Sequence, residues 1–295
     1  MKIIYLHQYF ITPSMQGGTR SYEMARRLVK RGHEVNLITT DQRGGRKAQW
    51  YESTESGIRV HWLPIYYENR LGFVDRVRAF LHFAVRSTSK AIEIGGDLIF
   101  ATSTPLTIAI PAILSSKRLG IPMIFEVRDV WPELPIAMGA LRNPILIALA
   151  RWLEQAAYRN SQHIVALSPG MKSSIMRQGV GEDRITVIPN SCDHDLFRPN
   201  EEEVLNFRGK HSWLNNRPLV VYAGTIGQVN GLTYMVELAS RVKKTAPEIR
   251  FLLVGSGKEE KLVVERGLVW WECFPLGLAL SSYSNLGSHP ICSRD

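Results

Sequence analysis

Short apolar runs alternate along this chain with longer stretches in which apolar residues recur at every third or fourth position. The runs have the length of buried strands, and the stretches have the period of amphipathic helices. The predicted strands are Lys2–Leu6, Val35–Thr39, Ile58–Leu63, Leu98–Ala101, Met123–Val127, His163–Leu167, Ile185–Ile188, Leu219–Ala223 and Phe251–Val254. The clearest predicted helices are Phe73–Ile94, Leu106–Leu119, Pro144–Arg159 and Leu232–Thr245.

The order of these elements predicts the fold class. Strands that alternate with helices form parallel sheets covered on both faces, so we predict an α/β protein. Residues 1–199 are expected to form a complete, doubly wound N-terminal lobe, and residues 200–266 an incomplete C-terminal α/β lobe. Residues 267–295 are expected to be an aberrant tail, because the last 28 residues hold three charged side chains and no amphipathic period. We expect poor order after about residue 258.

Composition narrows the class of protein. With 45% hydrophobic and 21% charged residues, the chain reads as globular. No apolar run approaches the roughly 18 residues of a membrane span, and the start lacks the pattern of a signal peptide. Three scattered cysteines indicate neither a disulfide framework nor a metal site. We therefore expect a cytoplasmic protein that uses no metal and no cofactor.

Charge is distributed unevenly. Residues 1–160 hold 21 Lys and Arg against 13 Asp and Glu, whereas the remainder holds 15 against 14. A basic half indicates an anionic partner, and no nucleic-acid-binding module is present, so a phosphorylated substrate or an anionic membrane surface is favoured. Of the two basic amphipathic helices, Phe73–Ile94 is the better membrane candidate, and 142–159 is expected chiefly to face the core. The predicted location is the inner-membrane face.

Glycines follow several predicted strands. Gly17 and Gly18 precede the first helix, where free backbone N–H groups and Arg20 favour a phosphate, although a plain turn is an alternative. Gly224 and Gly227 follow Leu219–Ala223 in the same way. Lys258 comes after a further glycine turn, for which an ordinary turn is the favoured interpretation.

The segment from Glu126 to Glu133 holds four charged residues directly after a strand. The carboxyl ends of strands are where open α/β sheets bind ligands. Asp129 and Arg128 are therefore the candidate catalytic residues, the first by accepting a proton or orienting a hydroxyl, and Glu133 is a candidate acceptor contact. The alternative is a structural ion pair of Arg128 with Glu126 or Glu133.

On these residues the chain resembles family 4 glycosyltransferases, bacterial enzymes with two α/β lobes in the GT-B architecture. The matching segments are the Gly17-Gly18 loop, Ala101-Thr-Ser-Thr-Pro-Leu106, Phe125-Glu-Val-Arg-Asp-Val-Trp-Pro-Glu133, Ala166-Leu-Ser-Pro-Gly170, Ile188-Pro-Asn-Ser-Cys-Asp193, Tyr222-Ala-Gly-Thr-Ile-Gly227 and Leu252-Leu-Val-Gly-Ser-Gly257. The third is most similar to a branch active in surface-polysaccharide assembly, which includes N-acetyl-L-fucosamine transferases.

The resemblance implies transfer of a sugar from a UDP- or GDP-sugar to an acceptor hydroxyl, with retention of configuration and without metal. It implies that the first lobe binds the acceptor, a saccharide linked to polyprenyl diphosphate, in O-antigen, capsule or exopolysaccharide assembly. The second lobe would hold the nucleotide, with Asn190, Gly224, Gly227 and Lys258 on the donor side.

The chain also departs from the family pattern. Arg128 stands where many members have the histidine of a His-Asp pair, and Thr225 and Asn230 stand where donor-clamping Arg and Lys are common. No two glutamates with seven residues between them follow Gly224. The alternative is therefore an inactive, truncated remnant that keeps an acceptor- or membrane-binding lobe, and we expect this chain not to transfer sugar. A nicotinamide-dependent dehydrogenase is disfavoured, because G-x-G-x-x-G is missing.

Overall fold

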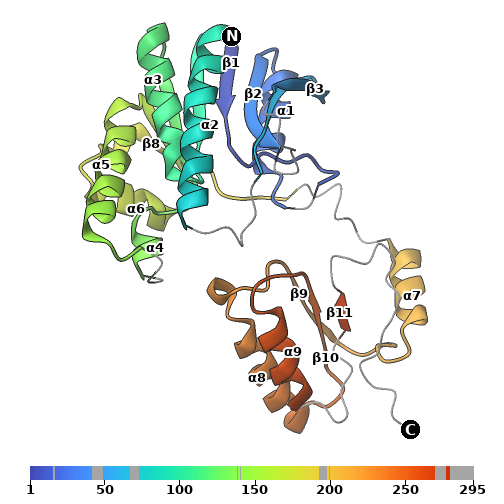
Figure 1. The fold of residues 1–295 in the computed structure, drawn as a ribbon. Coiled ribbons are helices and arrows are strands. Elements are labelled where there is room, and N and C mark those ends of the chain that lie inside the picture. The colour runs from blue at the N-terminus through green and yellow to red at the C-terminus, as the bar shows by residue number, and fades with distance from the viewer. Residues whose placement is uncertain are drawn as a thin grey trace. The chain divides into compact units, whose positions relative to one another are not determined.

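The computed structural model describes residues 1–15, 17–41, 49–66, 73–137, 139, 141–192, 198, 200–269 and 277–279. The chain divides into two compact units, Met1–Ser191 and Cys192–Asp295, and each unit has its own sheet (Figure 1).

The sheet of the first unit has the strand order β3-β4-β2-β1-β5-β6-β7-β8. Its strands are β1 (Lys2–Leu6), β2 (Glu34–Asp41), β3 (Tyr51–Glu55), β4 (Ile58–Pro64), β5 (Leu98–Thr102), β6 (Met123–Val127), β7 (His163–Ala166) and β8 (Ile185–Val187). All neighbours pair in parallel except β3, which runs antiparallel to β4 at the edge. The predicted α/β class with a parallel sheet is confirmed.

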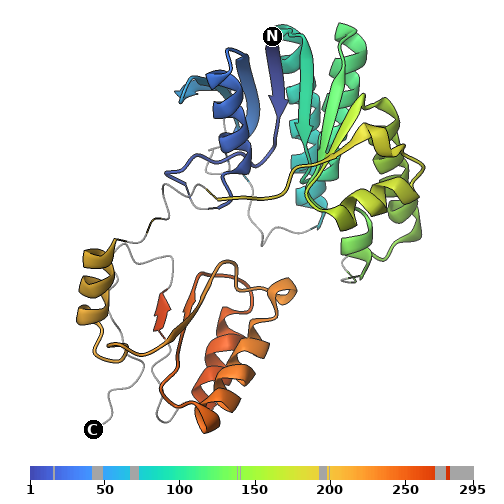
Figure 2. The ribbon, with the colours of Figure 1, turned by 180° about the vertical axis from the view of Figure 1, so that it is seen from behind.

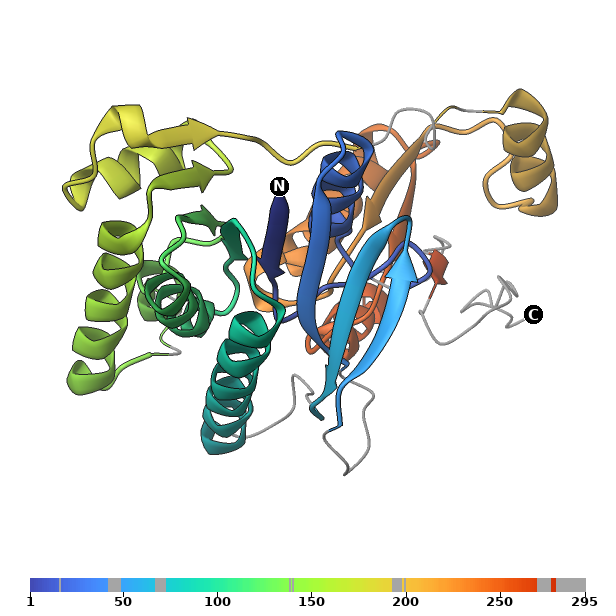
Figure 3. The ribbon, with the colours of Figure 1, turned by 90° about the horizontal axis from the view of Figure 1, so that it is seen from above.

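Helices cover both faces of this sheet. They are α1 (Arg20–Lys30), α2 (Phe73–Ile94), α3 (Ala109–Leu119), α4 (Glu133–Ala137), α5 (Pro144–Asn160) and α6 (Pro169–Arg177), with 3-10 turns at Leu106–Ile108 and Glu182–Arg184. Helices α2, α3 and α5 form one layer, and α1 lies on the opposite face (Figures 1 and 2). The same layers are seen from above in Figure 3.

Strand β1 shows why its sequence is apolar at every position. Ile4 and Leu6 pack into the core beneath α2 and α3, whereas Ile3 and Tyr5 pack into the core beneath α1. Successive side chains of a strand point to opposite faces, so a strand covered on both sides needs apolar residues throughout. This double burial places the carboxyl end of β1 in the middle of the sheet edge.

The helix ends follow ordinary capping chemistry. The Asn143 side chain accepts from the backbone N–H of Ile145 and Leu146 at the start of α5, and the Ser168 side chain accepts from that of Met171 in α6. Thr19 stands at the N-cap of α1, but its side chain makes no capping bond. Gly32 adopts the left-handed conformation after α1, as predicted.

The second unit contains a smaller parallel sheet of order β11-β10-β9. Its elements are α7 (Glu201–Lys210), β9 (Leu219–Ala223), a 3-10 turn at Gln228–Asn230, α8 (Leu232–Thr245), β10 (Arg250–Val254), α9 (Glu260–Val269) and β11 (Gly277–Ala279). A core that includes Val236 of α8, Phe251 of β10 and Val263 of α9 joins the two long helices to the sheet.

The prediction of poor order after about residue 258 is wrong for Glu260–Val269. These residues form α9, whose Val263 is fully buried, so apolar contacts order the chain beyond that point. A third strand, β11, pairs with β10, with Leu278 opposite Leu253. The rest of the predicted aberrant tail, with its tryptophans, lies outside the described residues.

Strand β3 and helices α6 and α7 are among the elements that were not predicted, and each lacks the apolar pattern on which prediction depends. Strand β3 is an edge strand in which no residue is buried. Helix α7 has no buried residue, and its Asn200 cap and acidic first turn support it instead. Helix α6 buries only Ile175.

Candidate functional site at the carboxyl edge of the first sheet

The carboxyl ends of β1, β5 and β6 meet at one edge of the first sheet. Parallel neighbours place the residues that follow these strands close together, namely His7 after β1, the 103–104 pair after β5 and the 128–129 pair after β6. Open α/β sheets bind ligands at this edge, where loops rather than side chains of the core present polar groups. The polar residues fall into two groups with different roles.

The first group is built around Arg20 and Glu126. The Arg20 side chain is 10% exposed, and the Glu126 side chain is fully buried. Arg20 Nη2 lies 2.9 Å from Glu126 Oε1, and Arg20 also donates to the carbonyl oxygens of Ile188 and Pro189, at 2.8 and 2.9 Å. Its last contact is with Asn190 Oδ1 at 3.4 Å.

These contacts give Arg20 a structural role. One guanidinium joins the start of α1, the end of β6 and the segment after β8, and its charge is balanced by a buried carboxylate. Thr102 completes the group by donating to Glu126 Oε2 at 3.0 Å. Burial, reinforced by the Glu126 charge, raises the pKa of Tyr5, so this phenol stays neutral beside the pair. The sequence-based role of Arg20 as a phosphate ligand remains a prediction that this pairing disfavours.

The second group is built around Arg128 and His7. Arg128 Nη1 lies 3.3 Å from His7 Nε2, and the Arg128 backbone N–H donates to Ser103 Oγ at 3.0 Å. His7 is buried, and burial, followed by the Arg128 charge, lowers its pKa to about 3. The imidazole is therefore neutral and accepts from the guanidinium. Among the described residues, no carboxylate pairs with Arg128, because Glu126 is engaged by Arg20 and Glu133 is exposed on α4.

Asp129 lies next to this cation. Its Oδ2 accepts from Thr104 Oγ1 at 2.7 Å, which fixes the carboxylate from the end of β5. Asp129 is only partly buried, so its second oxygen has access to solvent or to a ligand. The structure thus brings Arg128 and Asp129 together, and it leaves Glu133 apart from their contacts in the first turn of α4.

The two glycines before α1 differ. Gly17 has φ +136°, a conformation that other residues rarely adopt, and a Cβ there would meet Ile11 at 2.7 Å. Gly18 has ordinary backbone geometry, and its Cβ position lies 3.9 Å from Arg128 Nη2. Gly17 therefore shapes the loop, whereas Gly18 leaves space beside the guanidinium.

In the second unit, the loops after β9 and β10 pack backbone against backbone. The Ile226 N–H donates to Ser256 O, and the Gly224 N–H donates to Val254 O, both at 2.9 Å. A Cβ on Gly255 would stand 1.8 Å from the Gly224 carbonyl oxygen, and one on Gly257 would stand 2.1 Å from that of Ile226. Packing alone therefore requires Gly255 and Gly257.

The loop after β9 carries no cationic side chain. Asn230 Nδ2 and Tyr222 OH both donate to the Thr225 carbonyl oxygen, at 2.6 and 2.9 Å, so the loop is closed by neutral groups. Lys258 is exposed in the turn before α9. Gly227 faces nothing closer than ordinary contact, so its glycine is not explained by packing.

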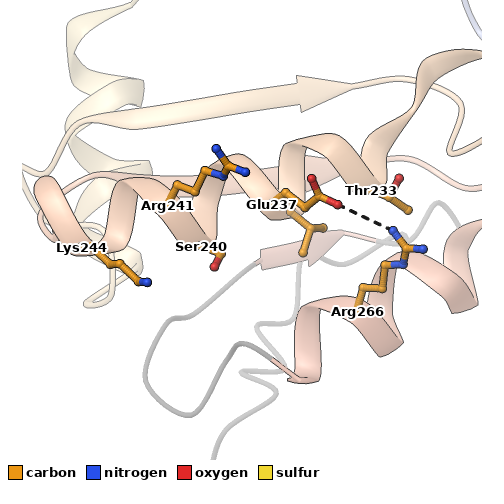
Figure 4. A pocket seen from close by; sticks show the side chains of 7 residues that line it. Thr233, Glu237, Ser240, Arg241, Lys244 and Arg266 are labelled. Atoms are coloured by element: carbon orange, nitrogen blue, oxygen red, sulfur yellow. Dashed lines mark ion pairs between the residues drawn. The ribbon is translucent and has the colours of Figure 1, made fainter.

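A hollow of about 620 Å³ lies between α8 and α9 (Figure 4). Glu237 and Arg266 face each other across it at 4.0 Å, and Arg241 and Lys244 line the same side. These side chains are exposed and lie on helix faces rather than at strand ends, so the hollow is a solvated surface feature.

The described residues contain no cluster of three His, Cys, Asp or Glu side chains arranged to hold a metal ion. No helix among them is both long and apolar enough to cross a membrane.

Residues 17–191 match the family described as "Glycosyl transferase 4-like domain". The match covers most of the first unit and more than half of the chain. The chain belongs to the glycosyl transferase 4-like family. Arg20, Arg128 and Asp129 therefore lie within the family domain, and His7 lies shortly before it.

Relatives of this glycosyl transferase 4-like chain include two bacterial proteins that are named as glycosyltransferases. It is 24% identical to the putative colanic acid biosynthesis glycosyl transferase WcaI of Escherichia coli K12, over 90% of the chain and 69% of WcaI. It is 26% identical to the probable glycosyltransferase WbjE of Pseudomonas aeruginosa, over 64% of the chain and 47% of WbjE.

Solved structures share the fold of this family member. Anabaena Alr3699/HepE in complex with UDP and glucose superposes with a TM-score of 0.63 at 16% identity, over 95% of the chain and 69% of HepE. Sucrose-phosphate synthase from Thermosynechococcus elongatus gives 0.68 at 14% identity, over 95% and 69%. These neighbours are GT-B glycosyltransferases, which agrees with the predicted fold class.

Sequence reasoning missed His7. A histidine directly after the first strand, in the same loop as the two glycines, was a usable signal, because residues after strands lie at the binding edge. Its contact with Arg128 spans 121 positions and follows only from the β1-β5-β6 order.

Proposed function

We propose that this chain is a glycosyltransferase that transfers a sugar from a UDP- or GDP-sugar to a lipid-linked saccharide in surface-polysaccharide assembly. The observation that carries the proposal is the location of Arg128 and Asp129. The pair projects from the carboxyl edge of the unit that matches the family, with Asp129 oriented by Thr104. The name of WcaI, a putative colanic acid biosynthesis glycosyl transferase, supports a polysaccharide product, and the name of WbjE supports glycosyl transfer.

In this proposal, Asp129 acts on the acceptor. A carboxylate within hydrogen-bond reach of a hydroxyl orients it and accepts its proton as the new bond forms. Arg128 supplies positive charge at the same edge, where it stabilises a phosphate of the acceptor or of the departing nucleotide. Gly18 provides the space through which such a group approaches Arg128.

The second unit is proposed to bind the nucleotide. Support comes from HepE, which was solved with UDP, and from the loop after β9, where Gly227 leaves room for close approach. Asn190 and Gly224 remain proposed donor contacts, and so does Lys258. Thr225 and Asn230 place no cation in this loop, so Lys258 and backbone N–H groups would carry the attraction for the diphosphate.

Association with an anionic membrane surface is also proposed. On α2, Val77, Leu81 and Val85 form an exposed apolar ridge, and on α5 Ile145, Leu149 and Trp152 form another. Both helices begin at the carboxyl edge of the sheet, where a membrane-embedded acceptor would present its sugar.

Basic residues flank both ridges, with Arg78 exposed on α2, Arg151 and Arg159 exposed on α5, and Arg142 just before α5. Such a pattern of apolar and basic side chains favours an anionic interface. The expectation that the 142–159 helix chiefly faces the core is thus only partly right, because α5 buries Glu154, Ala157 and Tyr158 and exposes its other side.

The test is a transfer assay with the purified chain, radiolabelled UDP- and GDP-sugars, and bacterial membranes as the source of acceptor. Sugar incorporation that falls at least tenfold in Asp129→Asn, while nucleotide affinity is unchanged, supports the proposal. The matched control is Asp183→Asn, an exposed aspartate in the 3-10 turn before β8.

The alternative is a chain that binds acceptor or membrane without transferring sugar. The neutral loop after β9 favours it. Calorimetry with UDP and with GDP separates the two: silence with both nucleotides, together with binding to anionic vesicles, would establish the alternative and overturn the proposed transfer.

A further inference from the structure

Two arginines stand at the same sheet edge in opposite electrostatic states. Arg20 is matched by the buried Glu126 carboxylate and by backbone carbonyl oxygens. Arg128 has a neutral imidazole as its side-chain partner, at 3.3 Å. A guanidinium and a neutral acceptor together carry a net positive charge, whereas a guanidinium and a carboxylate together carry none.

His7 is well suited to hold a cation without neutralising it. It is 3% exposed, and the backbone N–H of His7 donates to the Ile38 carbonyl oxygen at 3.2 Å, which ties the residue to β2. The ring therefore has a fixed location, and its low pKa keeps it uncharged at physiological pH. A protonated ring would instead repel the guanidinium.

The other ring nitrogen of His7 gives an independent sign of a ligand. When Nε2 accepts from Arg128, the hydrogen-bond network assigns the ring proton to Nδ1. Nδ1 is buried and has no partner among the described residues. A buried donor without a partner is costly, and such groups are concentrated where a ligand or water completes a site.

We infer that His7 is a positioning residue that holds the Arg128 guanidinium, with its charge uncompensated, for a phosphate group of the substrate. The inference rests on the proposed function, because a sugar-nucleotide or a lipid diphosphate is what would bring the phosphate. Gly18 lies beside the same guanidinium and leaves the approach open. His7 does not itself contact the reacting atoms.

The test compares His7→Glu with His7→Gln in the full chain, with inorganic pyrophosphate as the probe in calorimetry. The amide oxygen of Gln mimics the neutral Nε2 acceptor, whereas the carboxylate of Glu neutralises Arg128. We expect His7→Gln to keep pyrophosphate affinity within about threefold of wild type, and we expect His7→Glu and Arg128→Gln each to lower it about tenfold or more. His33→Glu, in the turn between α1 and β2, is the matched control.

A second measurement on the wild-type chain avoids any failure of the variants to fold. With ¹⁵N-labelled histidine, pyrophosphate should shift the ring resonances of His7 and leave those of His33 in place. An unmoved His7, equal affinity in His7→Glu and wild type, or equal losses in folded Gln and Glu variants would each overturn the inference.

Two further arms identify the source of the phosphate and separate this inference from the proposed function. Geranyl diphosphate and UDP are each tested as competitors of pyrophosphate, and the stronger competitor identifies the acceptor or the donor as the source of the phosphate. Sugar transfer is measured separately for each variant. If His7→Glu lost pyrophosphate binding but still transferred sugar at the wild-type rate, the role of His7 alone would be refuted. Absence of transfer with intact binding would refute only the proposed function.

Discussion

The two units contain strands of nearly the same composition in different environments. Strand β1 of the first unit buries four of its five residues, whereas β9 of the second buries none. Ile4 is fully buried, and Val221 is 52% exposed. The difference lies in what covers them: helices pack on both faces at β1, while the described core of the second unit joins α8 and α9 to the sheet. An apolar run therefore predicts a strand but not how deeply it is buried.

The largest expected effect concerns the first unit. Arg20→Ala leaves the Glu126 carboxylate buried without its cation, which should cost about 3–5 kcal/mol of unfolding free energy. This free energy is measured by urea unfolding that is monitored through the hydrogen exchange of backbone amides in the first unit. Arg26→Ala, which removes a more exposed cation paired with Glu23, is the control and should cost less than about 1 kcal/mol. Equal losses in the two variants would contradict the structural role of Arg20.

Matched truncations in β1 and β9 test the comparison directly. Ile4→Ala removes fully buried atoms and should lower the unfolding free energy of its unit by about 2–5 kcal/mol. Val221→Ala removes exposed atoms and should change stability by no more than about 0.5 kcal/mol. If Val221→Ala proved as costly as Ile4→Ala, β9 would be buried in solution and the contrast between the units would fail.

A pH-dependent effect is expected from Glu154 of α5. Burial raises the pKa of Glu154 to about 7 from an ordinary value of 4.5, although its Oε1 accepts from Tyr158 OH. Folding thus favours the protonated carboxyl, whose contribution is complete below pH 4.5 and is lost as the pH rises through 7.

Glu154→Gln removes this titration. It should raise stability by about 1–2 kcal/mol at pH 8, less than the full shift would give because part of the carboxyl remains hydrated, and change it little at pH 4. Thermal melts of both proteins across this range measure the effect. A constant difference between variant and wild type at every pH would show that Glu154 does not titrate abnormally.

The smallest effect compares two helix caps. Asn143→Ala removes the cap of α5, which packs against α3 and the sheet, and should cost about 1 kcal/mol of global stability. Asn200→Ala removes the cap of α7, which has no buried residue, so it should fray that helix without lowering the melting temperature. Hydrogen exchange resolved by segment distinguishes the two, and a global loss from Asn200→Ala would show that α7 is packed.

Local pattern was sufficient for elements with one continuous apolar face. Helix α2 has the predicted bounds, and so do β1, β6 and β9, because the apolar residues of each recur within one continuous segment of the sequence. Elements that are stabilised by other interactions were missed. Strand β3 is stabilised by its pairing with β4 at the sheet edge, and α7 is stabilised by its N-cap. The location of Arg128 and Asp129 after a strand was predicted, and the structure places them there.

The roles of the site residues depended on partners distant in sequence. The ion pair with Glu126, which was the alternative interpretation of Arg128, is made by Arg20 instead, across 106 positions, and the partner of Arg128 is a histidine near the N-terminus. Neither partner can be read from spacing, since strand order decides which residues meet at an edge. Electrostatic roles therefore required the topology, whereas candidate positions did not.

The glycines of the second unit bear on how variation among relatives is interpreted. At 255 and 257 a side chain of any kind would clash with the backbone of the neighbouring loop, so no other residue can replace glycine at these positions. Conservation of glycine at these two positions among relatives would therefore reflect the packing of the two loops, and it would not be evidence of nucleotide binding. Gly227 has room for a methyl group, so glycine retained at that position over evolutionary time would be evidence of a ligand.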